Sequence, residues 1–319
     1  MNGKVLGIDL GGTSIKAGIV SQTGKIDHIT RKPVVSSMTN DEILKSFYEI
    51  IDNFLLNYPD LRNAGIGSPG PIDIEKGIIK KSANLRKIKN LKIIENLKKR
   101  YKKIDFYLDN DASCAALGEK YFGLGKGVED FAVITLGTGV GGGLVINDKL
   151  FRGYKGNAFE IGHLPAYNKD LFEKNIPLFQ CGCGLTGCLE TMASATGVEK
   201  YFSYFSTGGL GPKKNKKTFS AFEIYQTAKK KDKYALKTFE IAGVSLGLMI
   251  SNLITLLNLR LIIITGGMSS ASKYLESHIN KTVEKYTFKE VKKICKIKFT
   301  KGDEGSGIKG AAALCFERL

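Results

Sequence analysis

Short apolar runs that end in glycines recur along this chain of 319 residues and set the expected architecture. Residues 5–10 are predicted to form a strand that ends in a glycine turn, and residues 15–20 to form the strand that leaves it. Residues 131–146 repeat this pattern around a Gly-Thr-Gly turn. An internal repeat of this kind predicts two similar α/β halves that face each other across a cleft.

The second run also contains the spacing Gly137-x-Gly139-x-x-Gly142, which formally matches the dinucleotide-binding fingerprint. In that fingerprint the glycine loop must open a helix. Here residues 144–148 read as the continuation of a strand and a turn. We therefore exclude a dinucleotide site of the Rossmann type.

Segments of helical or continuous apolar spacing predict the remaining elements. Helices are expected at residues 41–56, 91–101, 113–121, 222–228, 235–257 and 305–316, a strand with a rigid turn at 63–71, and strands at 106–108 and 261–265. The last strand ends at Gly266-Gly267, where small residues would let a flat ring approach the backbone. Residues 200–219 are rich in glycine and lysine, and we expect them to form a flexible excursion.

The turn of the first repeat carries residues suited to phosphate. Backbone N–H groups at Gly11 and Gly12 and the Thr13 hydroxyl are donors of the kind that bind phosphate oxygens. Asp9 could hold Mg²⁺ directly or through water, and Lys16 could neutralise phosphate charge or be an ordinary surface lysine. A plain glycine-rich hairpin would also explain these residues, but the second turn of the same pattern favours phosphate binding.

Residues 109–111, Asp-Asn-Asp, lie between the expected strand at 106–108 and the helix that follows it. Ligands of α/β proteins bind at the carboxyl ends of the strands, so these three polar side chains are placed for chemistry. Helix capping by Asn110 or Asp111 is the simpler alternative. It accounts for one residue rather than for the whole cluster.

A cysteine-rich loop lies in the middle of the chain, with a histidine shortly upstream. Three cysteines and one histidine supply the four sulfur and nitrogen ligands that close a structural zinc site: Cys181, Cys183, Cys188 and His163. A closed site has no open position for water, so the metal is expected to shape a pocket. Buried thiols or a disulfide are the alternatives, but no apolar signal segment opens the chain, and reduced thiols are expected. Two carboxylates bracket the ligands and stay available for another polar group: Glu160 and Glu190.

The composition is that of a globular protein, with 43% hydrophobic and 25% charged residues. No run approaches the roughly 18 apolar residues that a membrane span requires, so no membrane association is expected. The net charge of +17, from 48 basic and 31 acidic residues, raises the question of nucleic-acid binding. However, the lysines are spread along the chain, as in the runs 213–217 and 229–231, and no nucleic-acid-binding signature is present. Solvated lysine faces that attract anions, nucleotides included, explain the charge better.

Five motifs in this order resemble the ROK family of repressors, open reading frames and sugar kinases, within the hexokinase, actin and Hsp70 superfamily. They are Asp9-Leu10-Gly11-Gly12-Thr13, Asn110-Asp111-Ala112, the run 136–143, Glu160-Ile161-Gly162-His163 and the cysteine loop. The resemblance covers essentially the whole chain. It implies an α/β fold of two ribonuclease-H-like domains around a central cleft. The small domain would span residues 1–112 and be rejoined by the C-terminal helix 305–319, and the large domain, with the zinc-binding loop, would span 113–304.

The resemblance also implies an ATP-dependent hexose kinase that uses Mg²⁺ and a structural Zn²⁺, with Asp111 as the general base for the attacking sugar hydroxyl. The implied sugar-binding residues are Asn110, Asp111, Glu160, His163 and Glu190. The implied nucleotide-binding residues are Asp9, Gly11, Gly12, Thr13, Lys16, Thr138, Gly139, Gly266 and Gly267. The implied zinc ligands are His163, Cys181, Cys183 and Cys188, so that His163 would use one nitrogen for sugar and the other for the metal.

Glucose, phosphorylated at its 6-hydroxyl, is the substrate that we expect first, and N-acetylmannosamine and N-acetylglucosamine are the alternatives. A sugar-responsive regulator is a third hypothesis, disfavoured by the retained Asp111 and by a phosphate motif that begins at Val5. Phe159 stands where family members commonly have glycine or alanine, and its ring would narrow the pocket beside Glu160. The choice of hexose therefore stays open. The resemblance further implies a homodimer, and the chain is expected in the cytoplasm, in carbohydrate metabolism.

Overall fold

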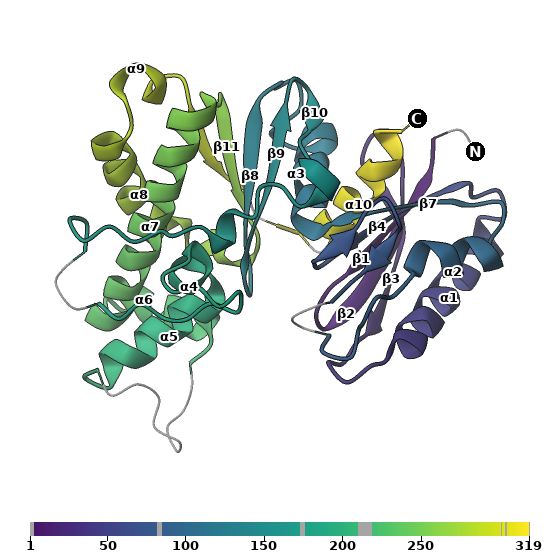
Figure 1. Cartoon of the computed structure of the whole chain (residues 1–319), viewed down its shortest axis with the longest axis horizontal. Coiled ribbons are helices and arrows are strands. Elements are labelled where there is room, and N and C mark those ends of the chain that lie inside the picture. The colour runs from purple at the N-terminus through teal and green to yellow at the C-terminus, as the bar shows by residue number, and fades with distance from the viewer. Residues whose placement is uncertain are drawn as a thin grey trace. The chain divides into compact units, whose positions relative to one another are not determined.

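The computed structural model describes residues 3–81, 85–172, 176–209, 219–300, 302–303 and 305–318 (Figure 1). The chain divides into two compact units, which are described one at a time. The first unit contains residues 1–129, 143–159 and 303–319, and the second contains residues 130–142 and 160–302. These units group residues 113–129 and 143–159 with the first part of the chain. The domain division after residue 112 stays a prediction.

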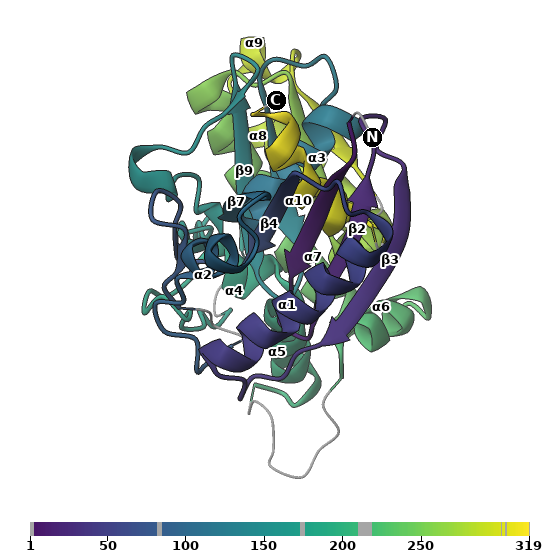
Figure 2. The same ribbon diagram turned by 90° about the vertical axis from the view of Figure 1, so that its right-hand side faces the viewer.

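The first unit is built on a five-stranded sheet with the order β3-β2-β1-β4-β7 (Figure 2). Its strands are β1 (Val5–Leu10), β2 (Ser14–Val20), β3 (Ile26–Pro33), β4 (Asn63–Ser68) and β7 (Asp105–Asn110), and β5 (Ile72–Asp73) and β6 (Ile78–Ile79) form a separate pair. Strands β1 to β3 are antiparallel neighbours, whereas β4 runs parallel to β1 and β7 parallel to β4. The carboxyl ends of β1, β4 and β7 therefore share one edge of the sheet, where α/β proteins bind their ligands.

Helices cover both faces of this sheet. On one face α1 (Asn40–Asn57) and α2 (Ile93–Arg100) share a continuous apolar core with the strands, and α1 begins with a capping box formed by Thr39 and Glu42. On the other face α10 (Ser306–Phe316) packs against Val5 and Val20. The helix α3 (Asp111–Phe122) packs in turn against α10. The C-terminal helix is thus an integral part of the first unit.

Two glycines let α10 approach the sheet closely. Gly7 on β1 and Gly65 on β4 are partners in the strand register. A methyl group at either position would overlap a backbone carbonyl of α10, that of Ile308 or of Ala311. These glycines are required by the packing of the helix on the sheet rather than by any turn.

A second five-stranded sheet has the order β10-β9-β8-β11-β12. Its strands are β8 (Phe131–Leu136), β9 (Val140–Ile146), β10 (Lys149–Leu150), β11 (Leu261–Thr265) and β12 (Lys296–Phe299). Strand β11 runs parallel to both β8 and β12. All five residues of β11 are buried, which fits a central parallel strand with both faces covered.

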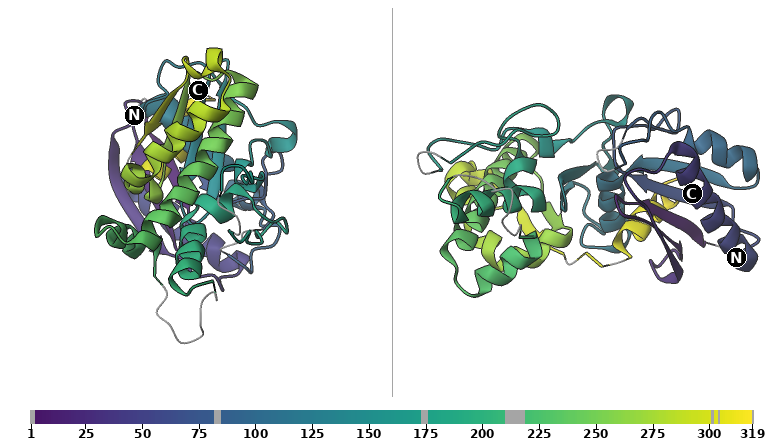
Figure 3. Two further views of the ribbon diagram at one scale, coloured as in Figure 1. Left: turned by 90° about the vertical axis from the view of Figure 1, so that its left-hand side faces the viewer. Right: turned by 90° about the horizontal axis from the view of Figure 1, so that it is seen from below.

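The helices of the second unit include one long helix, drawn in green, against which most of the others pack (Figure 3). They are α4 (Leu189–Ala193), α5 (Ala195–Ser206), α6 (Ala221–Lys229), α7 (Lys233–Leu257), α8 (Ser272–Tyr286) and α9 (Lys289–Lys292). The long helix α7 packs against α4, α5, α6 and α8. Among the described residues, α7 is the one helix long and apolar enough to cross a membrane, and 61% of its most apolar window is buried. Its apolar character is accounted for by its place in the core.

Most predicted elements are confirmed, with ends that shift by one or two residues. The strand predicted at 106–108 continues to Asn110, and the next helix begins at Asp111 without a turn between them. The flexible excursion predicted at 200–219 is wrong in its first part, because α5 continues to Ser206 and buries Val198, Tyr201 and Phe202 at helical spacing. Residues 210–218, with the lysine run 213–217, lie outside the described residues. Strands β3 and β12 and helix α8 were not predicted.

Candidate active site and metal site

The turn between β1 and β2 uses part of its own backbone to hold its shape. The Gly11 N–H donates to the Ser14 carbonyl at 2.9 Å, and the Thr13 carbonyl accepts from the Val34 N–H at 2.9 Å. The Gly11 amide is therefore engaged within the turn, whereas Thr13 is exposed at its tip. Thr13 stays a candidate phosphate contact, and Gly11 closes the turn that presents it.

Asp9 lies near the carboxyl end of β1 and is the register partner of Lys16 on β2. Its carboxylate packs against the start of α10, where a methyl group at Gly307 would overlap it. Burial raises the pKa of Asp9, and the positive charge of Lys16 opposes this shift. A divalent cation would offset the cost of ionising such a carboxylate, so the environment of Asp9 fits a Mg²⁺ ligand.

The sequence placed three polar residues at the end of β7 in one cluster, but the structure separates the first of them from the other two. The Asp109 side chain is only 1% exposed and accepts a hydrogen bond from Arg152 Nε at 2.7 Å. Arg152 also donates to Glu317, just beyond α10, at 2.6 Å. Burial raises the pKa of Asp109, and the charge of Arg152 opposes that shift. The expectation that Asp109 belongs to the chemical cluster is therefore wrong: it forms a buried ion pair with an arginine that the sequence analysis did not single out.

Asn110 and Asp111 remain as the candidate site residues on this edge. Asn110 is the N-cap of α3, and its side-chain oxygen accepts from the Ala112 N–H at 2.9 Å. The NH₂ group of the same side chain is therefore the part that can donate to a ligand. Asp111 is the first residue of α3 and has an exposed side chain whose Oδ1 also accepts from the Ala112 N–H, at 2.8 Å. Capping is thus real, and the two neighbouring side chains combine an amide donor with a carboxylate acceptor. Such a pair suits a sugar hydroxyl, which both donates and accepts.

In the second unit, the turn between β8 and β9 is anchored to the start of α5. The Ala195 N–H donates to the Gly137 carbonyl at 2.9 Å, and the Thr196 hydroxyl donates to the Thr138 carbonyl at 2.9 Å. The Gly137 N–H closes the turn by donating to the Gly139 carbonyl at 3.0 Å. The Thr138 side chain itself is exposed. The turn therefore presents the Thr138 hydroxyl on a backbone that is fixed by hydrogen bonds from the start of α5.

The glycines after β11 have different roles. Gly266 has a φ of +98°, and a methyl group there would overlap the backbone of Leu136. A methyl group at Gly267 would meet no atom within 4 Å. Gly266 is therefore required by the chain path, whereas Gly267 offers the open backbone surface that a flat ring could approach.

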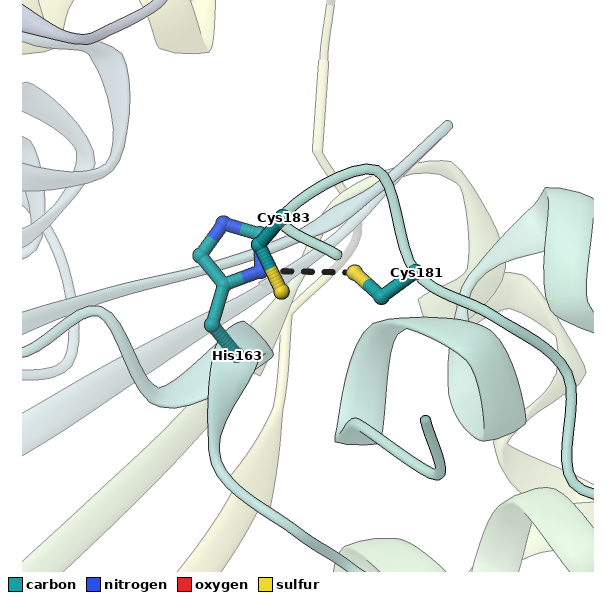
Figure 4. Close-up of side chains that lie close together, drawn as sticks. All are labelled: His163, Cys181 and Cys183. Carbon is teal, nitrogen blue, oxygen red and sulfur yellow. Dashed lines mark hydrogen bonds between the residues drawn. The ribbon is translucent and has the colours of Figure 1, made fainter. Parts of the chain in front are cut away.

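The metal-ligand candidates lie together, as Figure 4 shows for three of them. Cys181 Sγ is 3.5 Å from His163 Nδ1, and Cys183 Sγ is 3.7 Å from Cys188 Sγ. The ligand atoms of His163, Cys181 and Cys183 all lie within 4.8 Å of one another. Tetrahedral zinc with ordinary bond lengths requires sulfur–sulfur separations of about 3.8 Å and sulfur–nitrogen separations of about 3.6 Å. These two separations match those values, so His163, Cys181 and Cys183 fit three ligands of a structural metal ion, and Cys188 lies beside Cys183 as the candidate for the fourth.

The three thiols of the cysteine loop differ in the direction in which their surroundings shift the pKa. Burial raises the pKa of Cys181 and raises that of Cys188 to about 12, whereas a backbone hydrogen bond from Leu185 lowers the pKa of Cys183. A metal ion removes the proton from a coordinating thiol. All six cysteines are free, so no disulfide competes for these sulfur atoms.

Two carboxylates lie beside the metal-ligand candidates, as the sequence led us to expect. Glu160 keeps an exposed surface, but partial burial raises the pKa of its carboxyl; His163 opposes this shift and Glu190 adds to it. Glu190 lies in the first turn of α4 and accepts from the Val140 N–H at 3.2 Å. A methyl group at Gly162 would overlap the Val140 carbonyl, so the loop that carries Glu160 and His163 lies directly on β9. The structure thus brings three of the expected sugar-binding residues together within the second unit.

Phe159 has a φ of +65°, in the left-handed region that bulky residues rarely occupy. Glycine is the residue that this backbone favours. The unusual residue noted in the sequence is therefore also a strained one, directly before Glu160. The sequence offered no sign of the strain apart from the resemblance to proteins with small residues there.

Comparison with known proteins bears on the whole chain. The model of the ROK family matches residues 5–318. A glucokinase of Thermotoga maritima is 34% identical over 325 residues, which cover 99% of this chain and 98% of that protein. An N-acetyl-D-glucosamine kinase of Histophilus somni is 31% identical over 319 residues, which cover 98% of this chain and 99% of that protein.

The solved structure of a ROK family glucokinase from Streptomyces griseus, in complex with glucose and AMPPNP, superposes with a TM-score of 0.77 at 27% identity. The superposition covers 98% of this chain and 99% of that one. The expected α/β fold of the hexokinase, actin and Hsp70 superfamily is confirmed by this likeness.

Proposed function

Because this chain belongs to the ROK family and is an ATP-dependent hexose kinase, we propose that it transfers the γ-phosphate of ATP to the 6-hydroxyl of glucose. The observation that carries the proposal is the exposed carboxylate of Asp111 beside the amide of Asn110, at the edge where β7 ends. The Thermotoga glucokinase, which matches nearly the whole chain, supports glucose as the substrate.

In the proposed reaction, Asp111 accepts the proton of the sugar hydroxyl while that oxygen attacks the γ-phosphorus in line. The new bond joins the sugar oxygen to phosphorus, and the bond that breaks is the one to the oxygen retained by ADP. A positioned general base contributes about 10²- to 10⁴-fold to the rate of such a step. The remaining task is to hold the reactants and stabilise charge on the transferred group.

We assign the nucleotide to the two glycine turns and to the segment after β11. Thr13 and Thr138 are exposed at the tips of their turns and would donate to phosphate oxygens, with Gly12, Lys16 and Gly139 beside them. Asp9 would hold Mg²⁺, which would offset the negative charge of the phosphate groups. Gly266 and Gly267 would receive the adenosine side.

We assign Zn²⁺ to His163, Cys181, Cys183 and Cys188, where it would act as a structural ion. In this arrangement Nδ1 of His163 faces the sulfur atoms (Figure 4), so the other ring nitrogen is available for a sugar hydroxyl. A ligating histidine whose ring is fixed by the metal presents a defined donor or acceptor. Glu160 and Glu190 would bind further hydroxyls of the same sugar.

N-acetylglucosamine is the second candidate substrate, because the Histophilus relative is a kinase for that sugar. N-acetylmannosamine is a third, from the same resemblance. Phe159 is the residue on which the choice depends, since it precedes Glu160 directly. We also propose a cytoplasmic homodimer that binds neither nucleic acid nor membrane. A purely regulatory role is disfavoured by the retained Asp111.

The test is a comparison of Asp111→Asn with a matched control, Asp41→Asn, an exposed aspartate in the first turn of α1. ADP release with MgATP is measured across glucose, mannose, fructose, N-acetylmannosamine and N-acetylglucosamine, and sugar binding by calorimetry. Asp111→Asn should lower kcat by at least about 100-fold and leave the sugar Kd nearly unchanged, whereas Asp41→Asn should do neither. A normal kcat in Asp111→Asn would remove this residue as the base, and no turnover of any sugar by the wild type would overturn the proposal.

A further inference from the structure

Glu190 contacts the β8–β9 turn as well as facing the metal-ligand loop. Its Oε2 accepts a hydrogen bond from the Val140 N–H at 3.2 Å, and its Oε1 lies 3.6 Å from Cys181 Sγ. A methyl group added at Gly139 would overlap Oε2. One carboxylate assigned to the sugar is thus seated against the backbone of a turn assigned to the nucleotide.

Further contacts join the β8–β9 turn to the segment that follows the metal-ligand loop. Glu190 is in the first turn of α4, directly after Cys188, and α5 begins where α4 ends. The start of α5 binds the carbonyls of Gly137 and Thr138. The β8–β9 turn is therefore held along its length by residues that follow the metal-ligand loop, and Glu190 is the one of them with an acidic side chain.

We propose that Glu190 is a coupling residue: its contact with Gly139 and Val140 links the sugar site to the nucleotide-phosphate turn, so that each ligand strengthens binding of the other. The inference rests on the proposed function. A carboxylate has about four lone-pair sites and can accept from Val140 and from a sugar hydroxyl together. A sugar held by Glu190 would steady the turn, and a phosphate held by the turn would steady Glu190.

Gly139 is needed in this proposal for the space that it leaves to the Glu190 carboxylate and not for its backbone conformation. Its φ is not positive, so alanine would fit the backbone. The atom that an alanine would displace is the end of a flexible side chain, Glu190 Oε2, so the variant should fold with the carboxylate moved. Gly137, in the same turn, provides the matched control, because a methyl group there meets nothing within 4 Å and its φ is also not positive.

The experiment is calorimetric titration of glucose into wild type, Gly139→Ala and Gly137→Ala, with and without Mg·AMPPNP. In the wild type the nucleotide should lower the glucose Kd by about fivefold or more, the lower end of typical coupling. Gly139→Ala should weaken glucose binding severalfold even without nucleotide, and should lose the coupling. Gly137→Ala should keep the nucleotide-free glucose Kd of the wild type.

The inference is overturned if Gly139→Ala binds nucleotide-free glucose within twofold of the wild type, or if the wild type shows no coupling. Hydrogen exchange of the wild type gives a second measurement that needs no variant. Glucose should slow exchange in the peptide 137–142, and an unchanged rate would count against the contact. If the hexose preferred in the kinase assay is not glucose, that hexose is the probe. A wild type that binds no hexose would overturn the proposed function as well, whereas the outcomes above overturn the coupling alone.

Discussion

The buried ion pair between Arg152 and Asp109 leads to a stability prediction of defined size. Asp109 is 1% exposed and Arg152 24% exposed at the level of their side chains. Replacing Arg152 by methionine keeps most of the packing volume but leaves the Asp109 carboxylate without its cation. Breaking a buried pair in this way costs about 3–5 kcal/mol. Because Arg152 keeps some contact with solvent, we expect the lower end, roughly 3 kcal/mol.

The assay is urea unfolding followed by circular dichroism, with two further variants. Asp109→Asn combined with Arg152→Met removes the unpaired charge and should recover more than half of the loss. Arg100→Met is the matched surface control, since Arg100 and Asp52 form a pair with both side chains about half exposed. It should change the free energy of unfolding little.

The pH dependence gives an independent check with a defined sign. Burial already raises the pKa of Asp109 above 3.8, and removing Arg152 removes the charge that opposes this rise. An acid whose folded-state pKa is raised binds its proton more tightly in the native state, so stability falls as the pH rises through that pKa. The deficit of Arg152→Met should therefore be smallest at low pH. A deficit below about 1 kcal/mol, or one that the double variant does not reduce, would refute the reasoning.

Three further predictions concern the metal loop, Phe159 and Asp9. Cys183→Ser should lose its metal, measured by mass spectrometry, and raise the sugar KM because the His163 ring is no longer fixed; a metal-free variant with a normal KM would contradict this. Phe159→Gly should relieve roughly 1–2 kcal/mol of left-handed strain, partly offset by the flexibility of glycine, and should raise kcat/KM for N-acetylglucosamine relative to glucose. An unchanged ratio would show that Phe159 does not set selectivity. Asp9→Asn should abolish Mg²⁺-dependent turnover. It should also stabilise the ligand-free protein near neutral pH. Burial raises the pKa of Asp9 above 3.8, so ionising this carboxyl in the folded protein costs stability as the pH rises. Melting curves from pH 4 to 7 check this, and equal slopes for variant and wild type would argue against it.

The predicted elements that the structure confirms rest on local patterns of residues. The strand at residues 131–136, the glycine turn after it and the strand that leaves it are all encoded by neighbouring residues. The metal-ligand candidates were also recognisable, because three of the four lie in one short loop and cysteine and histidine are distinctive ligand types. The helix at residues 195–206 was missed although its apolar spacing is local, because glycine and lysine just beyond it dominated the interpretation.

The sequence by itself determined where the strands end in glycines and that a helix follows the strand at residues 106–108, and it indicated which residues are candidates for binding a metal. Only the tertiary structure decided which side chains share a surface. Successive residues of a strand point to opposite faces, so Asp109 turns away from Asn110. Its partner Arg152 lies 43 positions away, and that arginine's second partner, Glu317, lies 165 positions further along the chain. Gly7 and Gly65 likewise look ordinary until α10 packs on them. Such contacts join segments that are distant in sequence, and no local pattern of residues encodes them.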